Sequence, residues 1–188
     1  MSKKVAIGVD IGGTLTKVGI VDREGNLFAH TDFSTTKHKE FGDYLDELKS
    51  HIEELKSKMD FDYEITGIGV GAPNANFFRG TIEHAANLLW KGVVPFSEEL
   101  QKRYDLPVFI TNDASAAAIG EMIYGEAVNM KDFMVITLGT GLGSGIVANG
   151  QLIYGHDSQA GELGHVMIEK GGRLTGLGRR GGLEAYVS

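Results

Sequence analysis

Two short glycine turns in the sequence each carry a hydroxyl residue, a combination that suits phosphate binding. The first turn is Gly12-Gly13-Thr14 and the second is Gly139-Thr140-Gly141. Backbone amides that no side chain obstructs can surround an anion, and a threonine hydroxyl adds a donor. One such turn alone favours ordinary tight-turn geometry, whereas two turns at matching places in a repeat favour phosphate binding. Neither fits GxxxxGK[ST] or opens a helix as a complete GxGxxG, which disfavours dinucleotide binding.

Two aspartates lie where predicted strands end. Asp10 stands just before the first glycine turn, where its carboxylate either holds Mg²⁺ through water or caps the turn. Asp113 follows Asn112 at a predicted strand-to-helix junction. One alternative is that Asn112 or Asp113 caps the helix. The other is that Asp113 accepts a proton from a substrate hydroxyl, and the two roles are compatible. Phosphoryl transfer needs only a weak base, and a helix N-terminus keeps an aspartate ionised.

A carboxylate and an imidazole stand three residues apart in the segment Ala160-Gly161-Glu162-Leu163-Gly164-His165. A solvated loop would account for Glu162, and a structural role would account for His165. The alternative is polyol binding, because a carboxylate accepts hydrogen bonds from sugar hydroxyls and a histidine fixes the orientation of a ligand in a small pocket. The segment alone leaves both alternatives open.

Hydrophobic patterning predicts an α/β protein. Short apolar runs predict buried strands, and the first of them, Val5–Asp10, is expected to be buried on both faces. Apolar residues at alternating steps of four and three predict an amphipathic helix over 40–59. The expected strands cover 5–10, 17–22, 27–33, 65–70, 107–111, 133–138, 144–148 and 151–154, and further helices cover 96–104 and 113–124.

The segment from Phe133 repeats the opening of the chain. Strand, glycine turn, strand, glycine-containing hairpin and strand occur in the same order twice, with the hairpin glycines at Gly25 and Gly150. Such a repeat predicts two similar α/β domains that each offer a glycine turn to one ligand. The second copy has no counterpart to the later elements of the first, so we expect this sequence to be a fragment of a longer protein.

Composition narrows the class of protein. The chain has 188 residues, 27 glycines, no cysteine and a formal net charge of −7. The lack of cysteine excludes disulfides, thiolate metal sites and cysteine nucleophiles. The acidic balance disfavours nucleic acid and anionic membranes as partners. The sequence shows neither a signal peptide nor an apolar run long enough for a membrane span, so we expect a soluble cytoplasmic protein.

Taken together, these segments resemble the ROK family of sugar kinases and repressors, and its glucokinase branch most. Six segments carry the resemblance in the family's order: Asp10-Ile-Gly-Gly-Thr14, Gly69-Val-Gly-Ala-Pro73, Asn112-Asp113-Ala114, Thr137–Gly145, Ala160–His165 and Gly178–Tyr186. The resemblance implies the actin-like ATPase (ribonuclease H-like) fold, with two similar α/β lobes around a cleft. Residues 1–112 would form the N-terminal lobe, and residues 113–188 the start of a second, truncated lobe.

The resemblance also implies an activity, the ATP-dependent phosphorylation of a hexose, glucose above all, at its 6-hydroxyl. Asp113 would be the general base. The hexose and ATP would be the partners, with a homodimer as the oligomer. The sugar would be held by Asn112, Asp113, Glu162, His165 and Glu184, with Asn74 and Asn87 bordering the pocket. Mg²⁺ and the ATP phosphates would be positioned by Asp10, which reaches Mg²⁺ through water, and by Gly12, Gly13, Thr14, Gly139, Thr140 and Gly141.

One departure from the family concerns zinc. Many members bind a structural zinc ion through the histidine that matches His165 and through three cysteines. This chain has Thr175, Leu177 and Gly182 at the cysteine positions. Without thiolates no tetrahedral site remains, so we predict a loop without zinc, in which a protein acceptor orients His165.

Two other functions are alternatives. A sugar-responsive repressor of the same family needs a helix-turn-helix before the kinase-like part, and the first predicted strand already begins at Val5. An actin-like ATPase that acts on a protein partner is the other alternative, and the Glu162/His165 pair argues against it. Both are therefore disfavoured relative to a hexose kinase.

Overall fold

The computed structural model describes residues 2–139, 141–176 and 178–188. The chain divides into two compact units, residues 1–113 and residues 114–188. Among the described residues, no helix combines the length and apolar character needed to cross a bilayer.

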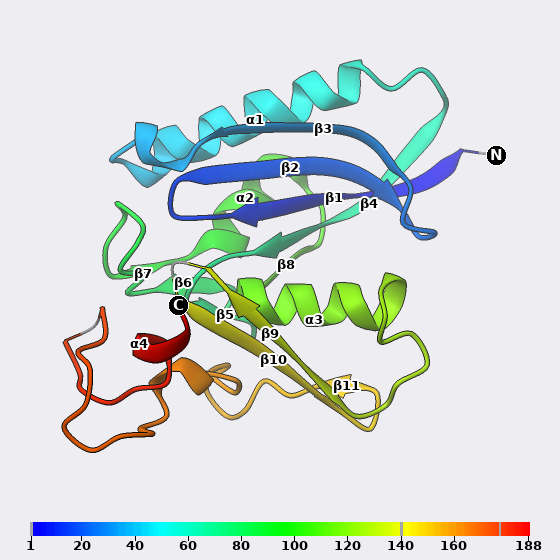
Figure 1. Cartoon of the computed structure of the whole chain (residues 1–188). Helices are drawn as coiled ribbons and strands as arrows, with labels where there is room; N and C mark the ends of the chain where they lie inside the picture. Colours follow the sequence, from blue (N-terminus) through cyan, green and yellow to red (C-terminus); the bar gives the residue numbers. More distant parts are fainter. Residues whose placement is uncertain (1, 140, 177) are drawn as a thin grey trace. The chain divides into compact units, whose positions relative to one another are not determined.

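The first unit is built on a five-stranded sheet (Figure 1). Strands β1 (Lys3–Ile11), β2 (Leu15–Asp22) and β3 (Leu27–Ser34) form an antiparallel meander, which confirms the predicted order. Strands β4 (Tyr63–Gly71) and β8 (Val108–Thr111) run parallel to β1, so the order is β3-β2-β1-β4-β8. The carboxyl ends of β1, β4 and β8 therefore lie at the same end of the sheet.

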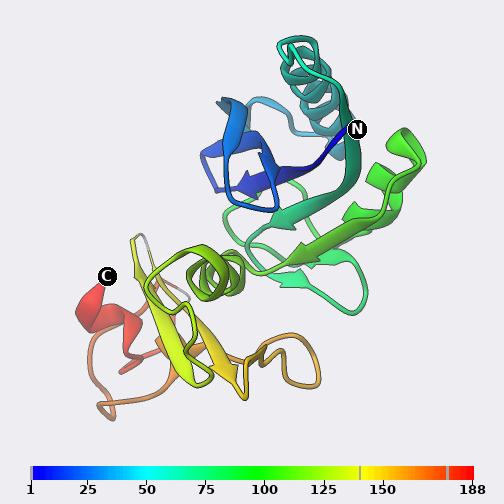
Figure 2. The same ribbon diagram turned by 90° about the vertical axis from the view of Figure 1, so that its right-hand side faces the viewer.

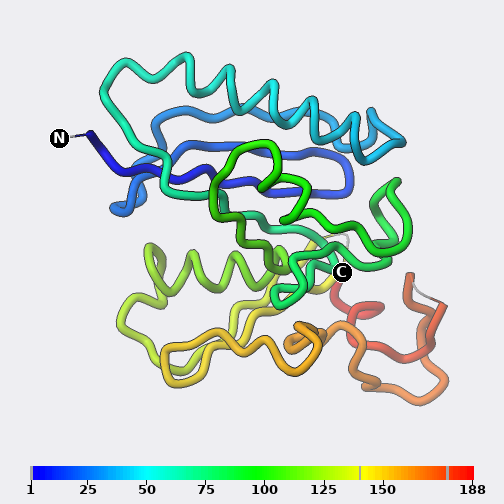
Figure 3. Tube along the Cα trace, turned by 180° about the vertical axis from the view of Figure 1, so that it is seen from behind, coloured from blue at the N-terminus to red at the C-terminus, as the bar shows by residue number. Residues whose placement is uncertain are grey.

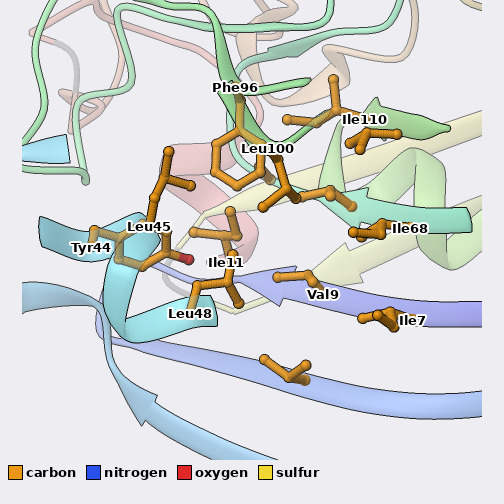
Figure 4. Packing of buried hydrophobic residues seen from close by; sticks show 14 of the residues in the cluster. Ile7, Val9, Ile11, Tyr44, Leu45, Leu48, Ile68, Phe96, Leu100 and Ile110 are labelled. Carbon is orange, nitrogen blue, oxygen red and sulfur yellow. The ribbon is translucent and has the colours of Figure 1, made fainter. Parts of the chain in front are cut away.

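Helices α1 (Phe41–Ser57) and α2 (Phe96–Tyr104) pack on this sheet (Figure 4). The predicted apolar stripe of α1 is confirmed, since four of its residues are at most 1% exposed: Leu45, Leu48, Ile52 and Leu55. They share one core with Phe96 and Leu100 of α2 and with alternate residues of β1, namely Val5, Ile7, Val9 and Ile11. Full burial of such a side chain contributes about 1.5–3 kcal/mol each, so α1 and α2 anchor the sheet through one of its faces.

The prediction that the first strand is buried on both faces is wrong. Between its buried residues, Ala6 and Gly8 are only partly buried, and Asp10 is exposed. Phe109 of β8 is likewise 64% exposed. The cause is that the buried cluster joined by α1 and α2 takes up only alternate residues of β1, because successive side chains of a strand point to opposite faces.

A small second sheet between β4 and α2 was not predicted. It consists of β5 (Ala75–Asn76), β6 (Thr81–Glu83) and β7 (Val93–Val94) in the order β5-β6-β7. Strands of two or three residues are too short to show an alternating pattern. The 3₁₀ helix η1 (Thr35–Lys37) after β3 was also missed, because three residues are too few to show a helical period.

The second unit contains the predicted repeat of the meander, β9 (Phe133–Leu138), β10 (Leu142–Ala148) and β11 (Gln151–Leu152). The last strand ends at Leu152, two residues before its predicted end at Tyr154. Helix α3 (Asp113–Tyr124) lies beside the hairpin of β9 and β10 within this unit, apart from its first residue (Figure 2). The rest of the unit is irregular backbone that includes the 3₁₀ helix η2 (Leu163–His165) and the one-turn helix α4 (Glu184–Val187), as the trace in Figure 3 shows.

Helix α3 approaches β10 closely because small residues meet on both elements. An added Cβ at Gly143 would stand 2.8 Å from the Cβ of Ala114, and one at Gly145 would stand 2.5 Å from the Cβ of Ala118. Real Cβ atoms do not approach so closely, so both strand positions require glycine at the present separation of helix and strand. Gly143 and Gly145 therefore serve the packing of helix against strand.

Candidate functional site

The first glycine turn contacts a second predicted site segment. Gly12-Gly13-Thr14 joins β1 to β2, and the Gly12 amide donates to the Leu15 carbonyl at 2.9 Å. An added Cβ at Gly13 would lie 3.1 Å from the Cβ of Asn87 and 3.3 Å from its Nδ2. The structure therefore brings Gly13 and Asn87 together, although they are far apart in the sequence.

A buried hydroxyl network links β2, which follows this turn, to η1 and α1. The sequence analysis did not predict it. The Thr16 hydroxyl lies 2.8 Å from the Thr35 hydroxyl and 3.0 Å from that of Tyr44. All three residues are at most 3% exposed. The Thr35 amide also donates to the Thr14 carbonyl at 2.9 Å. Burial raises the pKa of Tyr44, so its hydroxyl keeps its proton. Tyr44 lies next to Leu45 of the apolar stripe, and this position was the available sequence signal for its burial.

Asp10 and Asp113 act on each other electrostatically. Desolvation raises the pKa of Asp10, the nearby Lys17 ammonium opposes that rise, and the negative charge of Asp113 adds to it. Asp10 is in cross-strand register with Lys17 near the carboxyl end of β1. Asp113 is the first residue of α3, directly after β8 and Asn112. The two predicted carboxylates therefore belong to one end of the sheet of the first unit.

The structure gives Asn74 a role in the backbone of the first unit. This residue has a φ of 53° in the turn after β4. Its Nδ2 donates to the Glu83 carbonyl at 3.1 Å, and its own carbonyl accepts the Glu83 amide at 3.0 Å. Asn74 thus holds β6 against the end of β4, in addition to the sugar contact that the resemblance implies.

In the second unit, the predicted residues Glu162, His165 and Glu184 gather around Gly164. An added Cβ at Gly164 would stand 3.0 Å from the Leu142 carbonyl and 3.3 Å from the Cβ of Glu184. His165 Nε2 lies 3.8 Å from the Glu162 carboxylate, which is longer than a hydrogen bond, so the protein acceptor expected for His165 stays a prediction. The structure therefore brings η2, α4 and the start of β10 together.

The carboxylate of Glu184 also reaches the second glycine turn. Its Oε2 accepts the Leu142 amide at 3.1 Å, and an added Cβ at Gly141 would stand 2.6 Å from the same oxygen. Thr140, the hydroxyl residue of that turn, lies outside the described residues. Gly139 begins the turn, and its amide donates to the Gly141 carbonyl at 3.0 Å.

Ser144 is a supporting residue that the sequence reasoning missed. It is 3% exposed, and its hydroxyl donates to the Gly161 carbonyl directly before Glu162. Gly161 has a φ of 94°, which glycine adopts readily and other residues rarely do. A buried hydroxyl in an otherwise apolar strand needs such a partner, and that was the signal available in the sequence.

The described residues at the cysteine positions of zinc-binding relatives do not fit a zinc site. Thr175 is 6% exposed, and its Oγ1 accepts the Arg179 amide at 3.2 Å. An added Cβ at Gly182 would stand 3.0 Å from the Thr175 methyl and 3.1 Å from the Gly164 carbonyl, so that space is filled. Leu177 lies outside the described residues. Within the described part of the chain, no group of three or more histidine or acidic side chains could hold a metal ion.

Comparison with known proteins identifies the family. The ROK family profile matches residues 6–188. The chain belongs to the ROK family. This ROK chain is 36% identical over 197 residues to a glucokinase of Halalkalibacterium halodurans, which covers 100% of the chain and 58% of that protein. It is 38% identical over 185 residues to a glucokinase of Streptomyces coelicolor, which covers 98% of the chain and 56% of that protein.

A solved structure extends the likeness to three dimensions. The crystal structure of a ROK family glucokinase from Streptomyces griseus in complex with glucose and AMPPNP superposes with a TM-score of 0.83. The two are 34% identical, over 98% of this ROK chain and 57% of that one. The ROK chain therefore has the actin-like ATPase fold, which confirms the predicted fold class. It spans between 56% and 58% of the length of these three relatives.

Proposed function

We propose that this protein transfers the γ-phosphoryl group of ATP to the 6-hydroxyl of a hexose, with glucose as the preferred sugar. The observation that carries the proposal is the pair of carboxylates, Asp10 and Asp113, at one end of the first sheet next to the Gly12-Gly13-Thr14 turn. The likeness to glucokinases along 98% or more of the chain supports it.

Asp113 is the proposed general base. It is the first residue of α3 and follows β8 and Asn112. It takes the proton of the 6-hydroxyl while that oxygen bonds to the γ-phosphorus and the bond to the leaving ADP oxygen breaks. Because the transition state of phosphoryl transfer is loose, positioning matters more than base strength. An ordinary aspartate therefore suffices.

The remaining sugar hydroxyls are assigned to polar side chains. Carboxylates accept hydrogen bonds from hydroxyls, and amides both donate and accept them. The proposed sugar ligands are Asn112, Glu162, His165 and Glu184, with Asn74 and Asn87 at the border of the pocket. The contact of Asn87 with Gly13 supports this assignment, because it brings a proposed sugar residue next to a proposed phosphate residue.

The phosphates are assigned to Gly12, Gly13 and Thr14 and to Gly139, Thr140 and Gly141. Mg²⁺ is assigned to Asp10 through water. The residues fit this ion, because hard cations prefer carboxylate and water oxygens, and Asp10 and Asp113 place two carboxylates at one end of the sheet. When bound, Mg²⁺ neutralises charge on the transferring phosphate oxygens. Lys17, in register with Asp10, balances part of that carboxylate's charge.

The test is a coupled assay of the full-length protein with MgATP and a panel of hexoses and N-acetylhexosamines. We expect turnover with glucose. Asp113→Asn should keep glucose binding in calorimetry but lower kcat by about 10²–10⁴-fold, the usual contribution of a general base. Asp60→Asn, an exposed aspartate after α1, is the matched control and should keep normal turnover.

Three outcomes would refute parts of this proposal. Near-normal kcat in Asp113→Asn would remove Asp113 as the base. Glucose binding by the wild-type protein without any phosphorylation would favour a sugar-responsive repressor. ATP hydrolysis that no hexose stimulates would favour an ATPase acting on a protein partner.

A further inference from the structure

Two described residues of the segment 166–182, which lies between η2 and α4, contact the side chain of Tyr186: Glu169 and Arg173. The Tyr186 hydroxyl donates to the Glu169 carboxylate and accepts the Arg173 amide at 2.9 Å. The Arg173 guanidinium lies 4.9 Å from the centre of the Tyr186 ring, within the range of a cation–π contact. We call these three residues the Tyr186 clamp.

Backbone hydrogen bonds also link distant described residues of the segment. Four amide-to-carbonyl bonds close it: Ile168 to Gly181 at 2.8 Å, Gly181 to Arg173 at 2.8 Å, Thr175 to Arg179 at 2.7 Å and Gly178 to Thr175 at 2.9 Å. The Arg180 guanidinium adds a bond to the Gly172 carbonyl at 3.2 Å. These contacts include Thr175, one of the positions at which the resemblance implies a zinc ligand.

Gly172 lies where the clamp needs space. An added Cβ at this position would collide with the Tyr186 hydroxyl and would stand 2.9 Å from a Glu169 carboxylate oxygen. An added Cβ at Gly176, in the same segment, would meet nothing within 4 Å. A methyl group at position 172 therefore displaces the clamp, whereas one at position 176 does not.

Helix α4 connects the Tyr186 clamp to Glu184. Tyr186 and Glu184 lie on the same four-residue helix, which is far too short to be stable by itself. The amide of Leu183, directly before it, donates to the Val166 carbonyl at 3.0 Å, and Glu184 accepts the Leu142 amide beside the second glycine turn. The orientation of Glu184 thus depends on how α4 is held.

We propose that the Tyr186 clamp does the work of a structural metal in this chain: it closes the segment 166–182 and makes Tyr186 a positioning residue for Glu184. The second part rests on the proposed function, in which Glu184 holds a hexose hydroxyl. The first part does not.

Limited trypsin digestion tests the first part, because Lys170, Arg173, Arg179 and Arg180 are exposed in the segment. A hydrogen bond to a carboxylate is strong enough that its loss should raise the open population, and with it the cleavage rate, about tenfold. We expect this increase in Tyr186→Phe and in Gly172→Ala. Gly176→Ala and Tyr63→Phe, which loses a hydroxyl bond in the first unit, should be cut at the wild-type rate.

The same digestion is repeated after chelator treatment and after addition of zinc. We expect the wild-type rate to stay unchanged in both. Cleavage of Tyr186→Phe at the wild-type rate would overturn the clamp, and so would protection of the wild-type segment that zinc restores and chelator removes. Gly172→Ala guards against a folding defect in the tyrosine variant, and circular dichroism verifies that each variant is folded.

Steady-state kinetics of the full-length protein test the second part. A residue that only positions a binding group should change KM and leave kcat within about twofold. We expect Tyr186→Phe to raise the hexose KM several-fold and Gly176→Ala to leave it unchanged. An unchanged KM in Tyr186→Phe would overturn the positioning role. If the wild-type protein phosphorylates no hexose, the proposed function fails, while trypsin digestion still decides the clamp.

Discussion

The two meanders of the molecule share an order of elements but differ in burial. In the first unit, β1 pairs with both β2 and β4, and its core-facing residues from Val5 to Ile11 are at most 3% exposed. In the second unit, β9 pairs with β10 alone among the described residues. Its apolar residues Met134, Ile136 and Leu138 are 46%, 53% and 62% exposed.

The difference shows that an apolar strand does not determine its own burial. Both strands are apolar, but among the residues that the structure describes β1 alone has a parallel neighbour and the large side chains of α1 against it. Helix α3 instead offers alanines to the glycines of β10, which brings the backbones close but buries little apolar surface. Burial is therefore a property of the partner elements, and the two units should respond differently to the same kind of substitution.

The largest contrast is expected for loss of a large apolar side chain. Leu48→Ala removes a residue that is 0% exposed, and the cavity should cost about 2–5 kcal/mol of unfolding free energy. Ile136→Ala, on the exposed face of β9, should cost about 1 kcal/mol or less. Urea denaturation followed by circular dichroism measures both. Equal losses would mean that the exposed face of β9 is covered in solution.

The sequence predicted elements best where they are long. The apolar stripe of α1 and the strands of both meanders were placed within a few residues, because periodicity over six or more residues is a strong signal. The sheet β5-β6-β7 was missed since its strands have two or three residues. Burial of β1 was overpredicted, because the sequence does not reveal that α1 and α2 join the same core.

Site residues were predictable where they follow strands and turns. Asp10 and Asp113 were found because Asp10 closes one predicted strand and Asp113 lies two residues after another, and their interaction follows from the parallel order of β1 and β8. The contact of Gly13 with Asn87 and the bond from Leu142 to Glu184 could not be predicted. Both depend on the tertiary path of irregular segments, for which local pattern carries no information.

A second contrast concerns glycines in strands. Gly145→Ala places a methyl group against Ala118 and the Ala114 carbonyl, at 2.5 Å and 2.8 Å, and should cost about 1–3 kcal/mol through overpacking. Gly69→Ala in β4 is the matched control, because its added Cβ meets nothing within 4 Å. That variant should be neutral or slightly stabilising. Thermal melts of both variants would contradict this picture if Gly69→Ala were the more damaging.

The smallest contrast lies in the two hairpins, each closed by an aspartate. Asp22 is 3% exposed, accepts the Glu24 and Asn26 amides at 3.1 and 2.9 Å, and lies 2.8 Å from the Lys3 ammonium. Asp132 is exposed and accepts the Asn149 amide at 2.9 Å. Burial alone would raise the pKa of Asp22, but the bonds from Asn26 and Lys3 outweigh it and hold that pKa well below its usual value.

A carboxyl with a lowered pKa in the folded state stabilises the fold above its unfolded pKa, and that contribution is lost as the pH falls. The stability difference between the wild type and Asp22→Asn should therefore be constant near neutral pH and should shrink as the pH drops below about 4. Asp132→Asn should show a smaller difference at neutral pH, because its partner amide is exposed and an amide oxygen still accepts. Urea titrations at a series of pH values measure both differences. A difference for Asp22→Asn that grows on acidification would contradict the sign, since protonation of Asp22 removes the charge that the variant lacks.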